Sequence, residues 1–236
     1  MRTGIVTTVL LLTSTTLWCQ QAGSGKPDAQ QKVAELKQAI AANQAKLHKY
    51  QWLQTTQVSL KGKTRKDEEA QCHYDESGKV VKTPVGDTAP ATPQTPSRGL
   101  RGRIVEKKVD EMKDYTERLK SLISHYAPPN PEMIQAAVQA GNYDVNLSGG
   151  VAKLSFTNYY KPGDKVTFIF AAAAKKLQNY DVNTYLDDPK KDIVTLTNVF
   201  SSLPDGTNYL QQTILDAQGK QIKVTTTNQG YSLVAQ

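Results

Sequence analysis

The last third of the chain constrains the fold most strongly, because segments with alternating apolar and polar residues follow one another there between turn signals. In VAKLSFTNYY (151–160), for example, Leu154 and Phe156 occupy the same side of an extended chain. Turn signals such as LPDGTN (203–208) separate these segments. The spacing predicts an antiparallel meander of about six strands. The expected strands cover residues 151–160, 165–172, 177–186, 193–200, 209–216 and 221–227.

A further strand is expected in YQWLQTTQVSLKG (50–62), although this segment is nearly half glutamine, threonine and serine. Trp52, Val58 and Leu60 lie on one side of this strand, whereas the other side is polar except for Leu53. Together with strands at 67–74 and 80–83, the expected total is about nine. An antiparallel sheet of this kind buries one face and leaves the other in water.

Two long helices and one short helix are expected to cover the apolar face. The first, 27–49, has an apolar stripe that is interrupted by Asn43. The second covers 102–127, and the third begins at a cap formed by Asn130 with Pro131 in its first turn. The first stripe consists of Val33, Leu36, Ile40 and Leu47, and the second of Val105, Val109, Met112, Leu119, Leu122, Ile123 and Tyr126.

These elements predict an α+β fold, in which a large curved antiparallel sheet of about nine strands, an incomplete barrel, wraps around the helices. The segment PVGDTAPATPQTPSRG (84–99) holds four prolines and almost no bulky apolar side chain. We expect a long surface loop there, with a disordered connector as the default and a lid over a cleft as the alternative.

The N-terminus has the features of a secretory signal peptide, which we place at residues 1–24. Its apolar run is too short to span a bilayer, which needs about 20 apolar residues. Removal of this segment leaves residues 25–236, which we expect to form one domain of a periplasmic or secreted protein, with no later transmembrane segment. Lipoprotein anchoring through Cys19 is disfavoured, because that processing needs a small residue where Trp18 stands.

The net charge of +7 is spread along the chain, with local concentrations in KGKTRK (61–66) and at Arg98, Arg101 and Arg103. Such patches attract phosphates, including lipid head groups. The favoured interpretation is that the first patch is the solvated end of a hairpin and the second is the solvated start of a helix. No nucleic-acid motif is present, and nucleic acid is not expected as a partner.

The sequence contains no recognisable catalytic or cofactor motif. Its histidines lack metal-ligand spacing, and it has no nucleophile elbow, phosphate loop or zinc-binding cysteine pattern. Cys72 and His73 are neighbours on an expected strand, so they point to opposite faces. We expect Cys72 to be buried and inert, and we predict no enzyme, no cofactor and no metal, with catalytic residues scattered in sequence as the remaining alternative.

The order of elements resembles that of lipoprotein-carrier-like (LolA-type) periplasmic domains. The segments that carry the resemblance are YQWLQTTQVSLKG and YDESGKVVKTPVG after the first helix, and VTLTNVFSSLPDGTNYLQQTILDAQGKQIKV near the end. The chain also resembles an uncharacterised group of exported bacterial proteins. The LolA resemblance implies an incomplete barrel closed by helices, whose apolar hollow holds acyl chains of a lipid or lipoprotein.

We therefore predict an exported soluble protein that binds a lipid or another hydrophobic ligand between sheet and helices. The alternative is a non-catalytic structural or interaction module of the cell envelope, with another envelope protein as partner. Each candidate side chain also has a plain interpretation as core packed against residues such as Leu36, Val109 and Met112. The candidate lining residues are Trp52, Val58, Leu60, Leu154, Phe156, Val166, Phe168, Phe170, Leu196 and Phe200.

Overall fold

The computed structural model of the chain describes residue 38 and residues 41–86, 100–174 and 176–234. The expected signal peptide with Cys19, most of the first helix, Arg98 and most of the proline-rich loop lie outside the described residues, as do the side chains of Arg101 and Arg103. The described part of the first helix comprises residue 38 and residues 41–47.

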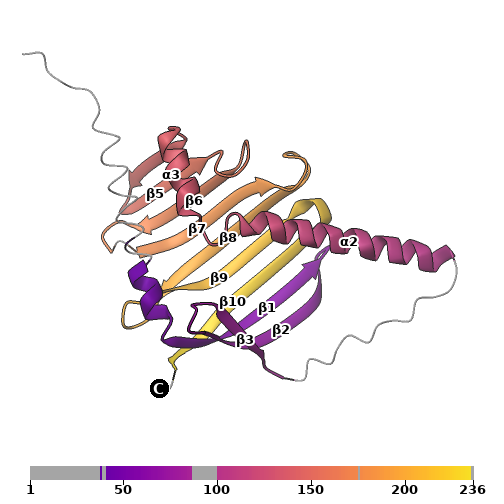
Figure 1. The fold of residues 1–236 in the computed structure, drawn as a ribbon, viewed down its shortest axis with the longest axis horizontal. Helices are drawn as coiled ribbons and strands as arrows, with labels where there is room; N and C mark the ends of the chain where they lie inside the picture. Colours follow the sequence, from indigo (N-terminus) through magenta and orange to yellow (C-terminus); the bar gives the residue numbers. More distant parts are fainter. Residues whose placement is uncertain (1–37, 39–40, 87–99, 175, 235–236) are drawn as a thin grey trace, which may run out of the picture.

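The described residues form one antiparallel sheet of ten strands, which is not closed into a barrel (Figure 1). Its order is β3-β2-β1-β10-β9-β8-β7-β6-β5-β4. The first strand therefore lies beside the last one, and Val58 of β1 faces Val224 of β10. The strands are β1 (Tyr50–Leu60), β2 (Lys63–Tyr74), β3 (Val80–Pro84), β4 (Tyr143–Ser148), β5 (Val151–Thr157), β6 (Lys165–Ala171), β7 (Lys176–Tyr185), β8 (Ile193–Ser202), β9 (Asn208–Ala217) and β10 (Ile222–Leu233).

The expected number of about nine strands was one too low, because β4 was not predicted. Tyr143, Val145 and Leu147 alternate with polar residues in β4, but the segment is short and follows a helix directly. Strand β2 also begins earlier than expected, at Lys63. Its first residues are almost all charged, so they have no apolar pattern that would predict a strand. They form a strand because they pair with β1.

The helices α2 (Leu100–Ser124) and α3 (Pro131–Gln139) lie on the same face of the sheet (Figure 1). The predicted cap of α3 is confirmed, since the Asn130 side chain accepts a hydrogen bond of 2.8 Å from the Glu132 backbone N–H. In α2, Leu119 and Leu122 are buried, as expected. The expectation for Val109 is wrong, because 46% of its surface is exposed in the half of the helix that extends beyond the core.

We call the side of the sheet that contacts α2 and α3 the helix face. A continuous apolar row crosses it, because residues opposite each other on paired strands point to the same side. The most deeply buried members pack with Tyr115, Leu119 and Leu122 of α2 and with Ile134 of α3. The row consists of Phe156, Val166, Val182, Leu196, Leu215, Val224 and Val58.

Asp164, in the turn between β5 and β6, is a buried carboxylate with only 1% of its surface exposed. Its oxygens accept hydrogen bonds from the backbone N–H groups of Tyr159 (2.6 Å), Tyr160 (2.9 Å) and Lys161 (3.0 Å). The Tyr126 hydroxyl donates a further bond of 2.6 Å. Because Tyr126 lies two residues after the end of α2, this carboxylate joins the end of the helix to the sheet.

Two more tyrosines fix the segment that connects α2 to α3. The Tyr180 hydroxyl donates to the Tyr126 carbonyl at 2.6 Å, and the Tyr159 hydroxyl contacts the Asn130 backbone. Burial raises the pKa of Tyr126 above its ordinary value, and the hydrogen bond to Asp164 raises it further. The buried hydroxyls therefore stay protonated, as hydrogen-bond donors, at neutral pH.

Asn43, the polar gap in the first helical stripe, has a structural role. Its side-chain amide donates to the Asn208 carbonyl at 2.6 Å and accepts from the Asn208 backbone N–H at 2.7 Å. The Asn208 side chain in turn donates to the Leu177 carbonyl at 2.8 Å. An apolar residue in place of Asn43 could not form hydrogen bonds with the backbone groups at the start of β9. The polar residue that interrupts the apolar stripe therefore attaches the helix to the sheet.

We expect Asn43→Ala to lower the free energy of unfolding by about 1–2 kcal/mol, since two backbone groups of Asn208 lose their partner. Urea unfolding followed by circular dichroism measures this. The control is Gln44→Ala, on the exposed side of the same helix, which should change stability by no more than about 0.5 kcal/mol. Equal effects of the two substitutions would contradict the assigned role of Asn43.

Candidate functional site

The helix face contains the candidate lining residues, and the helices cover part of them. Phe156 and Val166 are fully buried, and Phe168 is 1% exposed. Leu196 is buried in the same cluster, which also contains Leu119 and Leu122 of α2. These side chains pack against other protein side chains, so they are part of the hydrophobic core. Their role as ligand contacts stays a prediction.

A second group of candidates lies at the border of this core and is half-buried. Leu154 of β5 and Phe170 of β6 belong to it, and Phe200 of β8 packs against the same cluster. Leu177 of β7, which sequence analysis did not select, lies directly opposite Phe170. We call these four residues the apolar margin.

The apolar margin is continuous with the core but less covered by it. The ring of Phe170 stacks against that of Phe168, with centroids 6.3 Å apart. Both belong to the same face of β6, yet Phe168 is buried and Phe170 is half-buried. The margin is therefore the part of the predicted lining where apolar side chains retain accessible surface.

Trp52 lies apart from the other candidates, in a separate aromatic cluster on β1, β2 and β10. Its ring stacks on Tyr231 with centroids 5.5 Å apart and contacts Tyr74 at 5.2 Å. The indole N–H donates to the Asn228 side chain at 3.1 Å. Cys72 lies opposite Trp52 and is completely buried, which confirms its predicted burial, and burial raises the pKa of the thiol. Its predicted inertness stays a prediction.

A polar row crosses the helix face beside the apolar row, and sequence analysis missed it. It runs through Asn198, Thr213, Thr226 and Thr56, which lie opposite one another on β8, β9, β10 and β1. The Thr213 hydroxyl donates to the Asn198 side chain at 2.8 Å. The polar character of β1 therefore appears on both of its faces, and the helix face is apolar mainly from β5 to β8.

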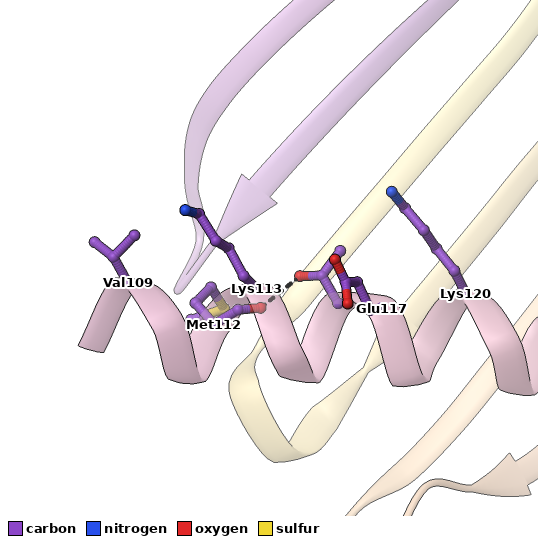
Figure 2. A pocket seen from close by; sticks show the side chains of 6 residues that line it. Val109, Met112, Lys113, Glu117 and Lys120 are labelled. Carbon is purple, nitrogen blue, oxygen red and sulfur yellow. Dashed lines mark hydrogen bonds between the residues drawn. The ribbon is translucent and has the colours of Figure 1, made fainter. Parts of the chain in front are cut away.

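A shallow hollow of about 320 Å³ lies along the exposed half of α2 (Figure 2). Val109 and Met112 supply its apolar surface, and Lys113, Glu117 and Lys120 flank it. All its lining residues belong to one helix. It is thus an open surface of α2 and not a space between helices and sheet.

A polar groove of about 430 Å³ lies where α2 meets the turns after β7 and β9. Arg118 forms a two-pronged ion pair with Asp187, with the shorter contact at 2.7 Å. The Tyr115 hydroxyl donates to Asp192 at 2.7 Å, and burial raises the pKa of Tyr115. These contacts anchor α2 to the turns, and they pair four of the residues that line the groove with each other.

The basic segment at residues 61–66 lies at the exposed hairpin end of β1 and β2, as the favoured interpretation predicted. Lys66 pairs with Glu68 of the same strand. In the sheet order, β10 and β9 separate this hairpin from the apolar margin. The two features therefore do not form one site.

Among the described residues, no group of three or more histidine, cysteine, aspartate or glutamate side chains could hold a metal ion. No helix in the described part of the chain has both the length and the apolar character needed to cross a membrane.

Comparison with known proteins gives structural neighbours alone. No protein-family model matches the sequence, and no curated protein matches it. One similar crystal structure is a DUF1329 family protein from Desulfovibrio piger, with 10% identity and a TM-score of 0.38 over 85% of this chain and 92% of that one. Another is a LolA superfamily protein from Nitrosomonas europaea, with 10% identity and a TM-score of 0.36 over 84% and 94%.

The second neighbour bears the name of the group that the order of elements in the sequence resembles. No residue or ligand is carried over from either protein.

Proposed function

We propose that this chain is an exported soluble protein that binds a lipid or another hydrophobic ligand at the apolar margin of the helix face. The supporting observation is the half-buried state of Leu154, Phe170, Leu177 and Phe200 on neighbouring strands of a sheet that is not closed. Binding an acyl chain there removes apolar surface from water on both partners, at about 0.8 kcal/mol for each buried CH₂ group.

The role proposed is binding and not catalysis. The buried polar groups near the helices, Asp164 and Asp192, are occupied by tyrosine and backbone donors. The four side chains of the apolar margin are all apolar and pack against the hydrophobic core, so an aliphatic ligand would meet side chains that match its chemistry.

The proposal predicts that the purified protein takes up a fluorescent fatty acid and that native mass spectrometry detects a lipid adduct. Phe170→Ala should weaken uptake about fivefold, because the lost phenyl contact contributes about 1 kcal/mol to binding. The control is Ile169→Ala, since Ile169 is also half-buried but lies opposite Asn179 on the other face of β6. Absence of uptake, or equal loss in both variants, would contradict binding at the margin.

The second candidate function is a structural or interaction module of the cell envelope. Complete burial of Phe156 and Val166 beneath α2 and α3 favours it, since a filled core leaves less room for a ligand. If the fatty acid is not taken up while the protein is correctly folded, this function is the better account.

A further inference from the structure

Strand β4 forms one end of the sheet order and presents exposed apolar side chains. Leu147 is 65% exposed and Val145 is 38% exposed. In the described residues, β5 is the one strand that pairs with β4. An unpaired strand edge is a template for pairing with another chain, and proteins usually protect it with lysine, proline or a bulge.

The two edges of the sheet differ in this protection. At the other edge, β3 contains Lys82 and ends at Pro84. Strand β4 has the sequence YDVNLS, with no lysine, arginine or proline, and its register with β5 has no bulge. Asp144 is its single charged residue. The chemistry that blocks pairing is therefore present at β3 and missing at β4.

The backbone groups that face outward from β4 can be identified from the hydrogen-bond alternation. The Thr157 N–H donates to the Asn142 carbonyl at 3.0 Å, so Asn142 bonds toward β5. In an antiparallel pair, every second residue of a strand exchanges hydrogen bonds with the partner strand. The residues of β4 that bond to β5 are therefore Asp144, Asn146 and Ser148. The N–H and C=O groups of Tyr143, Val145 and Leu147 consequently point toward the open edge.

We propose that two copies of this chain associate by antiparallel pairing of their β4 strands around a two-fold axis at Val145. Tyr143 of each copy then lies opposite Leu147 of the other, and Val145 lies opposite its own counterpart. These three residue pairs form about six main-chain hydrogen bonds, two for each pair. The two sheets become one continuous sheet.

A second copy fits this edge because the edge is complementary to itself. Under the two-fold axis, Asp144 of one copy lies opposite Asn146 of the other. The two Asp144 carboxylates therefore do not lie opposite each other, which avoids repulsion between like charges. Tyr143, Val145 and Leu147 of both copies share one side, which continues the apolar side of β4 and β5. An isologous contact of this kind closes as a dimer, whereas pairing of β4 with β3 would continue into a filament.

The oligomeric state tests the proposal. The purified protein should sediment with twice the mass of the chain, in a concentration-dependent equilibrium. Val145→Pro removes an outward-facing N–H without touching the bonds to β5, and Leu147→Lys adds an edge charge. Both variants should shift the protein to monomer with an unchanged circular dichroism spectrum. The control Val81→Lys, at the β3 edge, should stay dimeric. A wild-type monomer up to about 1 mM, or a folded dimeric Leu147→Lys variant, would overturn the proposal.

Cysteine cross-linking tests the register. Residues that exchange both hydrogen bonds in an antiparallel pair have Cα atoms about 5.5 Å apart, within disulfide range. Val145→Cys should give a covalent dimer on mild oxidation, whereas Asn146→Cys, which lies opposite Asp144, should give far less. The parent chain without residues 1–24, and therefore without Cys19, serves as the background control, because its remaining cysteine, Cys72, is buried. Equal cross-linking of the two variants would overturn the two-fold axis at Val145.

Discussion

Replacing Asp164 with alanine should lower the free energy of unfolding by about 4 kcal/mol, because several buried donors lose their acceptor at once. The carboxylate accepts hydrogen bonds from the backbone of Tyr159, Tyr160 and Lys161 and from the Tyr126 hydroxyl. Bulk water does not reach these donors in the native turn, since Asp164 is 1% exposed. Urea unfolding of the variant and the parent chain measures the difference.

Two comparison variants make the Asp164 result specific. Tyr126→Phe removes one donor and its contact with Thr184, and we expect a smaller loss of about 1–2 kcal/mol. Asp187→Ala removes an exposed carboxylate that pairs with Arg118, and we expect at most about 1 kcal/mol. If Asp164→Ala costs no more than Asp187→Ala, Asp164 does not join α2 to the sheet.

Phe168→Ala should also destabilise the fold by about 4 kcal/mol, because its ring lies in the closed core and its removal leaves a cavity. Phe170→Ala, two residues along the same face of β6, should cost about 2 kcal/mol, since Phe170 is half-buried. Thermal and urea unfolding of both variants give the comparison.

The two phenylalanine variants also separate core from binding surface. Phe168→Ala should leave fatty-acid uptake within about twofold of the parent chain under conditions where it is folded, whereas Phe170→Ala weakens it. Equal stability losses would show that the distinction between core and apolar margin is wrong. Loss of uptake in Phe168→Ala alone would place the ligand deeper than the margin.

Local patterns in the sequence predicted most elements of the fold. The alternation in 151–227 identified β5 to β10, because a half-buried strand has a period of two whatever its neighbours are. The pairing of β1 with β10 was not predictable in this way, since it joins segments far apart in the chain. Strand β4 was missed because a segment as short as YDVNLS has a weak signal by itself.

The candidate site was less predictable than the fold, because burial depends on where the helices end. Phe168 and Phe170 occupy equivalent positions in the alternating pattern of the sequence. Only the position of α2 and α3 determines that Phe168 belongs to the core and Phe170 to the apolar margin. Val109 fits the apolar stripe of α2 yet lies beyond the core. Thr56 and Thr226 are polar on the helix face, a feature that alternation cannot reveal without the register between β1 and β10.

Photo-cross-linking tests most directly whether a hydrophobic ligand lies against the apolar margin. A fatty acid with a diazirine at the end of its acyl chain is bound, irradiated and located by peptide mass spectrometry. The account predicts labels on Leu154, Phe170, Leu177 or Phe200, and their loss with excess unlabelled fatty acid. Labels confined to the other face of the sheet, or to the surface of α2 around Val109 and Met112, would contradict it.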